Sequence, residues 1–149
     1  MTFLTFVALH LALNSVWRWI WAANLIFLSL DHLSTGLLGV FAPQRAIRIY
    51  RGLFGIQFPE SPEIVAVLKP WGALAVFAAV ATIFPIVDPL RYRGVLIALL
   101  VLLLLRIMIR FSARATATAL FGLSPQRNAW HIALIGLCAS LIASEILLL

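Results

Sequence analysis

Asp31 and His32 lie side by side inside a long apolar stretch, residues 14–42. An ionisable side chain at the depth of a hydrocarbon core is costly to bury, so it commonly marks a ligand site, a proton path or an ion pair. Neighbouring residues of a helix point about 100° apart, so the two side chains belong to different helix faces. Asp31 shares its face with Asn24, and His32 shares its face with Ser29. We therefore expect this helix to be covered on two sides by protein or by a cofactor.

Both residues also have a structural interpretation. Asp31 would pair with an arginine, and His32 would donate a hydrogen bond to a backbone carbonyl or a hydroxyl. Arg106 is the candidate arginine, because it is the deepest of three that repeat every fourth residue, Arg106, Arg110 and Arg114. The competing interpretation is that all three extend to lipid phosphates. The predicted intramembrane polar site comprises Asn24, Asp31, His32 and Arg106.

Two other contacts are expected from these residue types. Arg18 and Glu145 should lie at similar depth near one membrane surface, where we expect an ion pair between the first and last spans. His32 is a candidate axial ligand of a tetrapyrrole, because small residues on its face leave room for a ring. A second ligand from His131 is disfavoured, because the depths of the two histidines differ by roughly 10 Å at the helical rise per residue. We predict no metal site and no catalytic residue, because the metal-binding, nucleophile and phosphate-binding motifs are absent from the sequence.

The composition places these residues in a membrane. Hydrophobic residues make up 64% of the 149 residues and charged residues 11%, with a mean hydropathy of +1.09. One soluble core could not bury so much apolar surface. Apolar runs such as residues 95–105 do not alternate, so we expect helices rather than barrel strands. The formal net charge is +6, but the basic residues flank apolar runs, so we expect membrane lipids rather than nucleic acid as partners.

Prolines divide the chain into helices. Pro43 ends the first span, and a break near Asn14-Ser15 would separate that span from a short N-terminal arm. The third helix would run from Pro89 to Phe121. Pairs of a capping residue and a proline predict the later helix starts: Ser61-Pro62, Asp88-Pro89 and Ser124-Pro125. The predicted fold is an all-α integral membrane domain with spans at residues 15–42, 64–87, 89–111 and 127–148.

Residues 44–54 predict an amphipathic helix at the membrane surface. Its arginines recur every third residue, and a second stripe carries Ile47, Tyr50 and Phe54. The predicted ligands of lipid head groups are Arg45, Arg48, Arg51, Arg110 and Arg114. Most of the 11 Lys and Arg residues flank the first and third loops, so the positive-inside rule places those loops in the cytoplasm and both termini outside.

Small residues form faces on three spans, where helix backbones can approach closely. The faces are Ser29, Gly36 and Gly39 in the first span, Gly72, Ala75, Ala79 and Thr82 in the second, and Gly136, Ser140 and Ser144 in the fourth. We expect these faces to join the helices into a bundle, or to join the bundle to other transmembrane subunits or to a second copy.

The layout combines Arg18 near the start of the first span, a basic interfacial segment, the Pro-Trp-Gly-Ala-Leu entry into the second span (70–74), Arg106 in the third and Glu145 in the fourth. In these features it resembles the DoxX-like group of small four-helix bacterial membrane proteins. The resemblance implies a link to quinone-dependent respiratory or sulfur-oxidising systems, with Arg18, Arg106 and Glu145 as the residues to watch. The group offers no counterpart for Asp31 and His32.

Two functions follow from this sequence. The first is a non-catalytic subunit or assembly protein of a larger bacterial inner-membrane complex of respiratory or photosynthetic type. It is favoured by the small size, the small-residue faces and the lack of catalytic signatures. The alternative is a quinone- or lipid-handling redox component with an intramembrane site at Asp31, His32 and Arg106. Quinone, lipid and tetrapyrrole are the cofactors that such a site could take, and the sequence requires none of them.

Overall fold

A computed structural model describes residues 3–57 and 60–149, with the side chains of residues 3–14 and of Phe54 outside that description. All the regular secondary structure of the described residues is helical and none of it is strand, as predicted. The helices are α1 (Phe3–Phe41), α2 (Pro43–Phe54), α3 (Pro62–Val87), α4 (Arg93–Ser112), α5 (Arg114–Phe121) and α6 (Pro125–Leu148).

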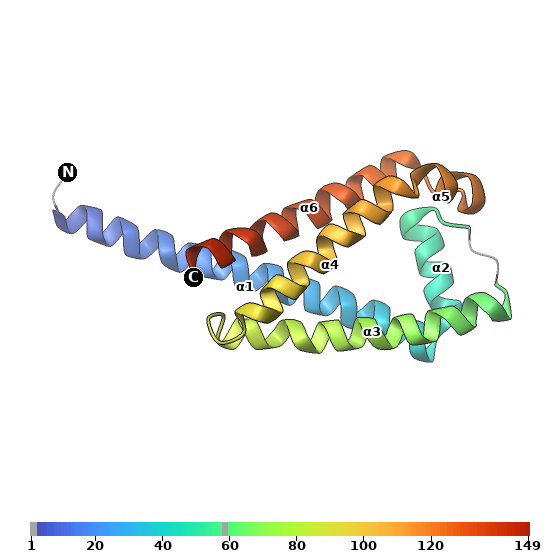
Figure 1. Ribbon diagram of the computed structural model, residues 1–149, viewed down its shortest axis with the longest axis horizontal. Coiled ribbons are helices and arrows are strands. Elements are labelled where there is room, and N and C mark those ends of the chain that lie inside the picture. The colour runs from blue at the N-terminus through green and yellow to red at the C-terminus, as the bar shows by residue number, and fades with distance from the viewer. Residues whose placement is uncertain (1–2, 58–59) are drawn as a thin grey trace.

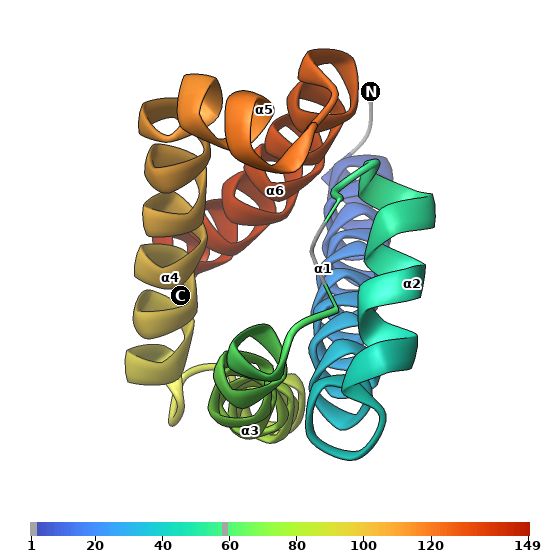
Figure 2. The same ribbon diagram turned by 90° about the vertical axis from the view of Figure 1, so that its right-hand side faces the viewer.

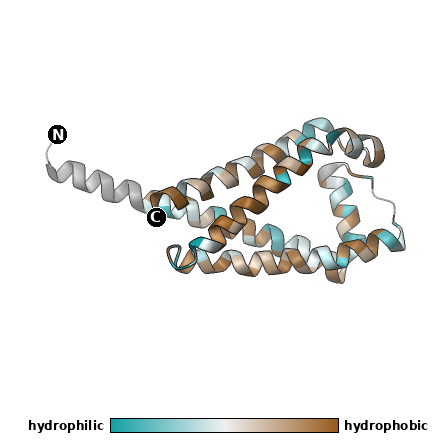
Figure 3. Ribbon diagram, in the orientation of Figure 1, coloured by the Kyte–Doolittle hydropathy of each residue, from teal (hydrophilic) through white to brown (hydrophobic). Residues whose placement is uncertain are grey.

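Four helices are long and apolar enough to cross a membrane, so the chain is a multi-pass membrane protein. Figure 3 shows hydrophobic residues along most of α3, α4 and α6, whereas hydrophilic residues gather where α2 joins the bundle. The four candidate spans are Ser15–Phe41, Pro62–Val87, Arg93–Ser112 and Pro125–Leu148. They agree with the predicted spans except at the start of the third.

The bundle consists of two helix pairs that diverge (Figures 1 and 2). α1 packs most extensively on α3, and α4 packs most extensively on α6. A short turn, residues 88–92, joins α3 to α4 at one end, which we call the turn end. From there α3 and α4 separate toward the other end, which carries α2 and α5 and which we call the open end (Figure 1). A core of α1, α4 and α6 residues, centred on Leu25, Leu96 and Ile142, holds the pairs together.

Glycine backbones bring α1 and α3 into direct contact. A Cβ added at Gly36 would lie 2.8 Å from the Gly72 carbonyl oxygen, and one added at Gly72 would lie 2.7 Å from the Gly36 carbonyl oxygen. The Ser29 hydroxyl donates to the Ala79 carbonyl oxygen across 2.9 Å in the same interface. The predicted small faces of the first two spans therefore meet one another.

The third predicted small face points away from this bundle. A Cβ at Gly136 would have no neighbour within 4 Å among the described residues. Ser140 and Ser144 donate to carbonyl oxygens of their own helix, at Gly136 and Ser140. Among the described residues, the Gly136 position of this face of α6 therefore packs on no other helix.

α2 crosses the open end at a steep angle to the spans (Figure 1), as predicted for a helix in the membrane surface. Ala46, Ile47 and Tyr50 are buried on it and pack with Leu68 of α3. Its arginines lie on the exposed side. Gly55 ends the helix in the left-handed conformation, with φ at 70°, and its N–H donates to the Arg51 carbonyl oxygen.

The break expected at Asn14-Ser15 is wrong. α1 runs through that point as one helix of 39 residues, about 58 Å long, against a hydrocarbon core of about 30 Å. No proline or glycine occurs before Gly36, so nothing in this part of the sequence forces the helix to stop. Its first turns extend past the turn end of the bundle (Figure 1).

The helix predicted from Pro89 to Phe121 is wrong at its start and in its middle. Asp88 caps only a single turn, because its Oδ1 accepts from the Arg91 N–H at 3.0 Å, and α4 begins at Arg93. α4 then ends at Ser112, whose hydroxyl donates to the Ile109 carbonyl oxygen and competes with the helix ladder. The starts predicted at Pro62 and Pro125 are confirmed, and the Ser61 hydroxyl accepts from the Ile64 N–H at 3.4 Å.

Candidate functional site

A cleft of about 650 Å³ lies between α1, α2, α3 and α4. Most of its wall is apolar, and the α3 residues Val67, Trp71 and Leu74 are exposed along its edge. A cleft of this volume is large enough for a drug-sized ligand. The polar side chains that line it are Asp31, His32 and Thr35 of α1, Tyr50 of α2, and Arg106 and Arg110 of α4.

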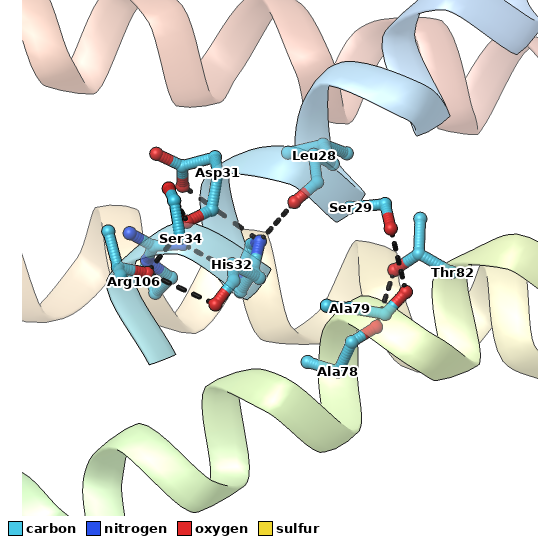
Figure 4. A network of polar contacts seen from close by, with 10 residues as sticks. Leu28, Ser29, Asp31, His32, Ser34, Ala78, Ala79, Thr82 and Arg106 are labelled. Atoms are coloured by element: carbon cyan, nitrogen blue, oxygen red, sulfur yellow. Dashed lines mark hydrogen bonds and ion pairs between the residues drawn. The ribbon is translucent and has the colours of Figure 1, made fainter. Parts of the chain in front are cut away.

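His32 and Arg106 are in direct contact at this cleft (Figure 4). The Arg106 Nη1 lies 3.1 Å from His32 Nε2, and His32 Nδ1 lies 2.7 Å from the Leu28 carbonyl oxygen. A guanidinium can only donate, so Nε2 must be the unprotonated nitrogen and accept. The ring is then neutral, with its proton on Nδ1, which donates to the Leu28 carbonyl. The expectation that His32 donates to a backbone carbonyl agrees with this geometry.

The pair suggested between Asp31 and Arg106 does not form in the described part of the chain. The Asp31 side chain is 44% exposed, and its Oδ2 lies 3.9 Å from His32 Nδ1. The reason is the helical offset between neighbours, which turns His32 toward α4 and leaves Asp31 at the margin of the cleft. Asp31 therefore adds negative charge to the lining without neutralising Arg106.

Arg110 is tied to α6 rather than free at the surface. Its Nη1 donates to Asn128 Oδ1 at 3.0 Å, and Asn128 Nδ2 donates to the Arg110 carbonyl oxygen at 3.4 Å. Arg110 therefore lies at the cleft with a fixed position, unlike the exposed Arg114. Of the other arginines expected at lipid head groups, Arg45 and Arg48 are exposed on α2. Arg51, also exposed, forms an ion pair with Glu60 at 3.7 Å.

Asn24 lies outside this cleft. Its Nδ2 donates to the Cys138 carbonyl oxygen of α6 at 3.3 Å, where it is buried between α1 and α6. The predicted polar site is therefore split. His32 and Arg106 are together, Asp31 lies beside them, and Asn24 serves a helix contact nearer the turn end.

The ion pair expected between Arg18 and Glu145 is replaced by a different contact. Glu145 is 6% exposed, and its Oε2 accepts from the Trp17 Nε1–H at 3.0 Å. Arg18 is exposed, and no ion pair joins it to Glu145 in the described part of the chain. Trp17 and Trp21 share the face that α1 turns toward α6, whereas Arg18 lies about 100° away from it.

The arrangement around His32 does not fit a tetrapyrrole. Axial coordination needs the lone pair of a ring nitrogen, and His32 Nε2 uses its lone pair to accept from Arg106. The Nδ1 side is occupied by the Leu28 carbonyl. Among the side chains that the structure describes, no group of three or more His, Cys, Asp or Glu residues could hold a metal ion.

Tyr50 and Trp71 line the cleft, although the sequence did not indicate them as site residues. Their rings meet edge to face, with centroids 6.4 Å apart. Burial raises the pKa of Tyr50 above its usual value. The only signal in the sequence was their type, an aromatic ring with a polar group near a membrane surface. Their common cleft depends on how α2 folds back over α3, which periodicity alone does not reveal.

No protein-family model, curated protein or solved structure matches the chain. The likeness to the DoxX-like group therefore remains one of layout.

Proposed function

We propose that this protein binds a membrane-soluble amphiphile, a lipid or a quinone, in the cleft between α3 and α4. The observation that carries the proposal is the composition of the cleft, which joins an apolar wall to a polar end made of His32, Arg106 and Arg110. Small-molecule sites combine an apolar lining with a few placed polar groups in this way.

The position of the cleft supports entry from the bilayer. α3 and α4 separate toward the open end (Figure 1), and Trp71 of α3 and Ile109 of α4 are both exposed at the cleft. An apolar chain can therefore lie between the two helices while its polar end reaches Arg106. No redox or hydrolytic step is part of this proposal.

Native mass spectrometry of the protein extracted in mild detergent tests the proposal, followed by organic extraction of any bound species. Ala78→Phe places a ring inside the cleft, whereas Ala73→Phe places the same ring on the exposed face of α3. We expect a lipid or quinone to be retained by the wild type and by Ala73→Phe but lost from Ala78→Phe. Equal retention in both variants would show that the ligand lies elsewhere.

A second candidate is the accessory-subunit function, in which this chain joins a larger membrane complex. It is favoured by the face of α6 at Gly136 and Ser140, where a Cβ at Gly136 would meet no other helix among the described residues and Ser140 is exposed. Cysteine crosslinking from Gly136→Cys in native membranes tests it, with Gly94→Cys of α4 as the matched exposed control. A single crosslinked product from position 136 alone would support the candidate, and crosslinking from both positions or from neither would oppose it.

We further propose that the membrane is a bacterial inner membrane and that the open end faces the cytoplasm. Arg45, Arg48 and Arg114 lie at the open end, whereas Arg18 and Arg91 lie toward the turn end. The positive-inside rule then places both termini outside. Labelling of single cysteines at Gln57 and Leu149 with a membrane-impermeant maleimide in intact spheroplasts tests this orientation. Only the cysteine at 149 should react.

A further inference from the structure

We propose that the ligand of the cleft is an anion, an oxyanion head group on an apolar chain, held between Arg106 and Arg110. This inference rests on the proposed function and goes further, because it selects the head group. A neutral quinone and an anionic amphiphile fit the apolar wall equally well, so the choice depends on the charges at the polar end.

The charges that line the cleft do not balance. Arg106 and Arg110 are both partly buried there, and in the described part of the chain no carboxylate pairs with either guanidinium. His32 is neutral because its Nε2 accepts a hydrogen bond from Arg106, and Asp31 is the single acidic residue of the lining. The lining thus keeps an excess of positive charge, and partly buried charge is stabilised when an opposite charge comes to it.

Arg106 and Arg110 have hydrogen-bond donors to spare for a ligand. A guanidinium carries five N–H donors. The contact with His32 occupies Nη1 of Arg106, and the contact with Asn128 occupies Nη1 of Arg110. These contacts hold the two side chains in place and leave other N–H groups of each guanidinium to donate to a ligand. Residues four apart on a helix lie about 6 Å apart along its axis, so one oxyanion can accept from both arginines.

The residues around the two arginines favour a head group with an attached chain. Thr35 and Tyr50 also line the cleft, and Trp71 lines it on the apolar side. The Thr35 hydroxyl already donates to the Asp31 carbonyl oxygen at 2.7 Å, so the donors for a head group come from the two arginines. A carboxylate or a phosphate with an attached chain would match donors at one end and hydrocarbon at the other. Free inorganic phosphate would meet only the donors and would gain nothing from the apolar wall.

The experiment uses the full chain in nanodiscs of zwitterionic phosphatidylcholine and follows tryptophan quenching by a brominated fatty acid. Trp71→Phe identifies the part of the signal that comes from the cleft. We expect Arg106→Gln and Arg110→Gln each to weaken binding about tenfold or more, because each removes a charge-assisted contact. Arg114→Gln is the matched control, because it continues the same series but does not line the cleft.

Competition then identifies the source of the anion. A phosphatidylglycerol with short chains should displace the brominated fatty acid, and millimolar inorganic phosphate should not. Displacement by phosphate alone would overturn the requirement for a chain. A short-chain neutral quinone should displace the brominated fatty acid only weakly from the wild type. Its own affinity should be the same for Arg110→Gln as for the wild type.

Two results would overturn the inference and leave the cleft as a binding site. They are unchanged binding in both arginine variants, and quinone binding as tight as that of the fatty acid. If Arg114→Gln weakened fatty-acid binding as much as Arg110→Gln does, binding would depend on the general positive charge of the surface and not on the cleft. This result would also overturn the inference. If neither the brominated fatty acid nor the quinone quenched the fluorescence of Trp71, the proposed function itself would be wrong. Arg106→Lys keeps the charge, so it separates a lost charge from a misfolded variant.

Discussion

The Nη1 of Arg106 donates to Nε2 of His32 across 3.1 Å, and this bond links α4 to α1 at the cleft. It makes the two residues depend on each other. Arg106 needs an acceptor at that depth, and His32 must remain neutral to supply one. The bond thereby couples the protonation of His32 to the position of Arg106.

Replacement of His32 should cost more stability than replacement of Asp31. His32→Leu leaves the Arg106 contact without its acceptor, and we expect a loss of about 1–3 kcal/mol in the free energy of unfolding. Asp31→Asn should change it by about 0.5 kcal/mol or less, because Asp31 is half exposed and pairs with no arginine in the described residues. Unfolding in mixed micelles of increasing SDS fraction measures both. A larger effect from Asp31→Asn would contradict the geometry described here.

The contact of α1 with α3 should be sensitive to a single methyl group. Gly72→Ala would place a Cβ 2.7 Å from the Gly36 carbonyl oxygen, so the two helices must move apart. We expect a destabilisation of about 1–3 kcal/mol, the usual cost of overpacking. Gly136→Ala and Gly94→Ala are matched controls with open space around the added atom. They should be neutral or stabilising in the same assay, because alanine favours the helix.

The partner of Glu145 can be identified by comparing neighbouring substitutions. Trp17→Phe removes the N–H that donates to the buried carboxylate, and we expect a loss of about 1–3 kcal/mol. Trp19→Phe should have little effect, because Trp19 is 76% exposed. Arg18→Gln should also stay within about 0.5 kcal/mol. Thermal unfolding followed by circular dichroism gives the ranking, and a dominant effect of Arg18→Gln would restore the ion pair expected from the sequence.

Tyr50 should make the protein less stable at high pH. Burial raises the pKa of its phenol in the folded state, so the unfolded chain ionises first. The contribution is complete below the pKa of the unfolded tyrosine, about 10, and is lost as the pH rises toward the folded value. The slope can reach about 1.4 kcal/mol per pH unit. Unfolding free energies between about pH 9 and pH 11 should fall less for Tyr50→Phe than for the wild type, and parallel curves would argue against a buried phenol.

The helices could be predicted because each has a local signal. Apolar runs indicated the spans, and small residues marked three candidate faces, but the sequence did not say that the faces of Gly36 and Gly72 would meet while that of Gly136 would not. The error at Asp88 arose because an Asp before a proline caps a turn as well as a helix, and the local sequence does not distinguish the two. The break at Ala113 follows Ser112, whose hydroxyl donates to the Ile109 carbonyl oxygen, but serine also makes this bond inside helices, so the residue type does not predict a break.

The site could be predicted only in part, because partners depend on how each helix is rotated. His32 and Arg106 were both candidates, but the choice between His32 and Asp31 as the partner of Arg106 depends on an angle of about 100° around α1. The glycine contact with α3 fixes that rotation. The rotation of α1 also decides whether Trp17 or Arg18 points toward α6, and the order of the two residues in the chain does not indicate which.

The divergence of α3 and α4 also determines how a ligand would be supplied. The cleft is lined by exposed apolar residues of the span α3, namely Val67, Trp71 and Leu74. A ligand would therefore enter it from the bilayer and would not have to pass through water. A bound chain would exchange with its neighbours in the plane of the bilayer. Occupancy would then follow the mole fraction of the ligand among the surrounding lipids, rather than its aqueous concentration. Membrane composition would set the loading of this protein directly.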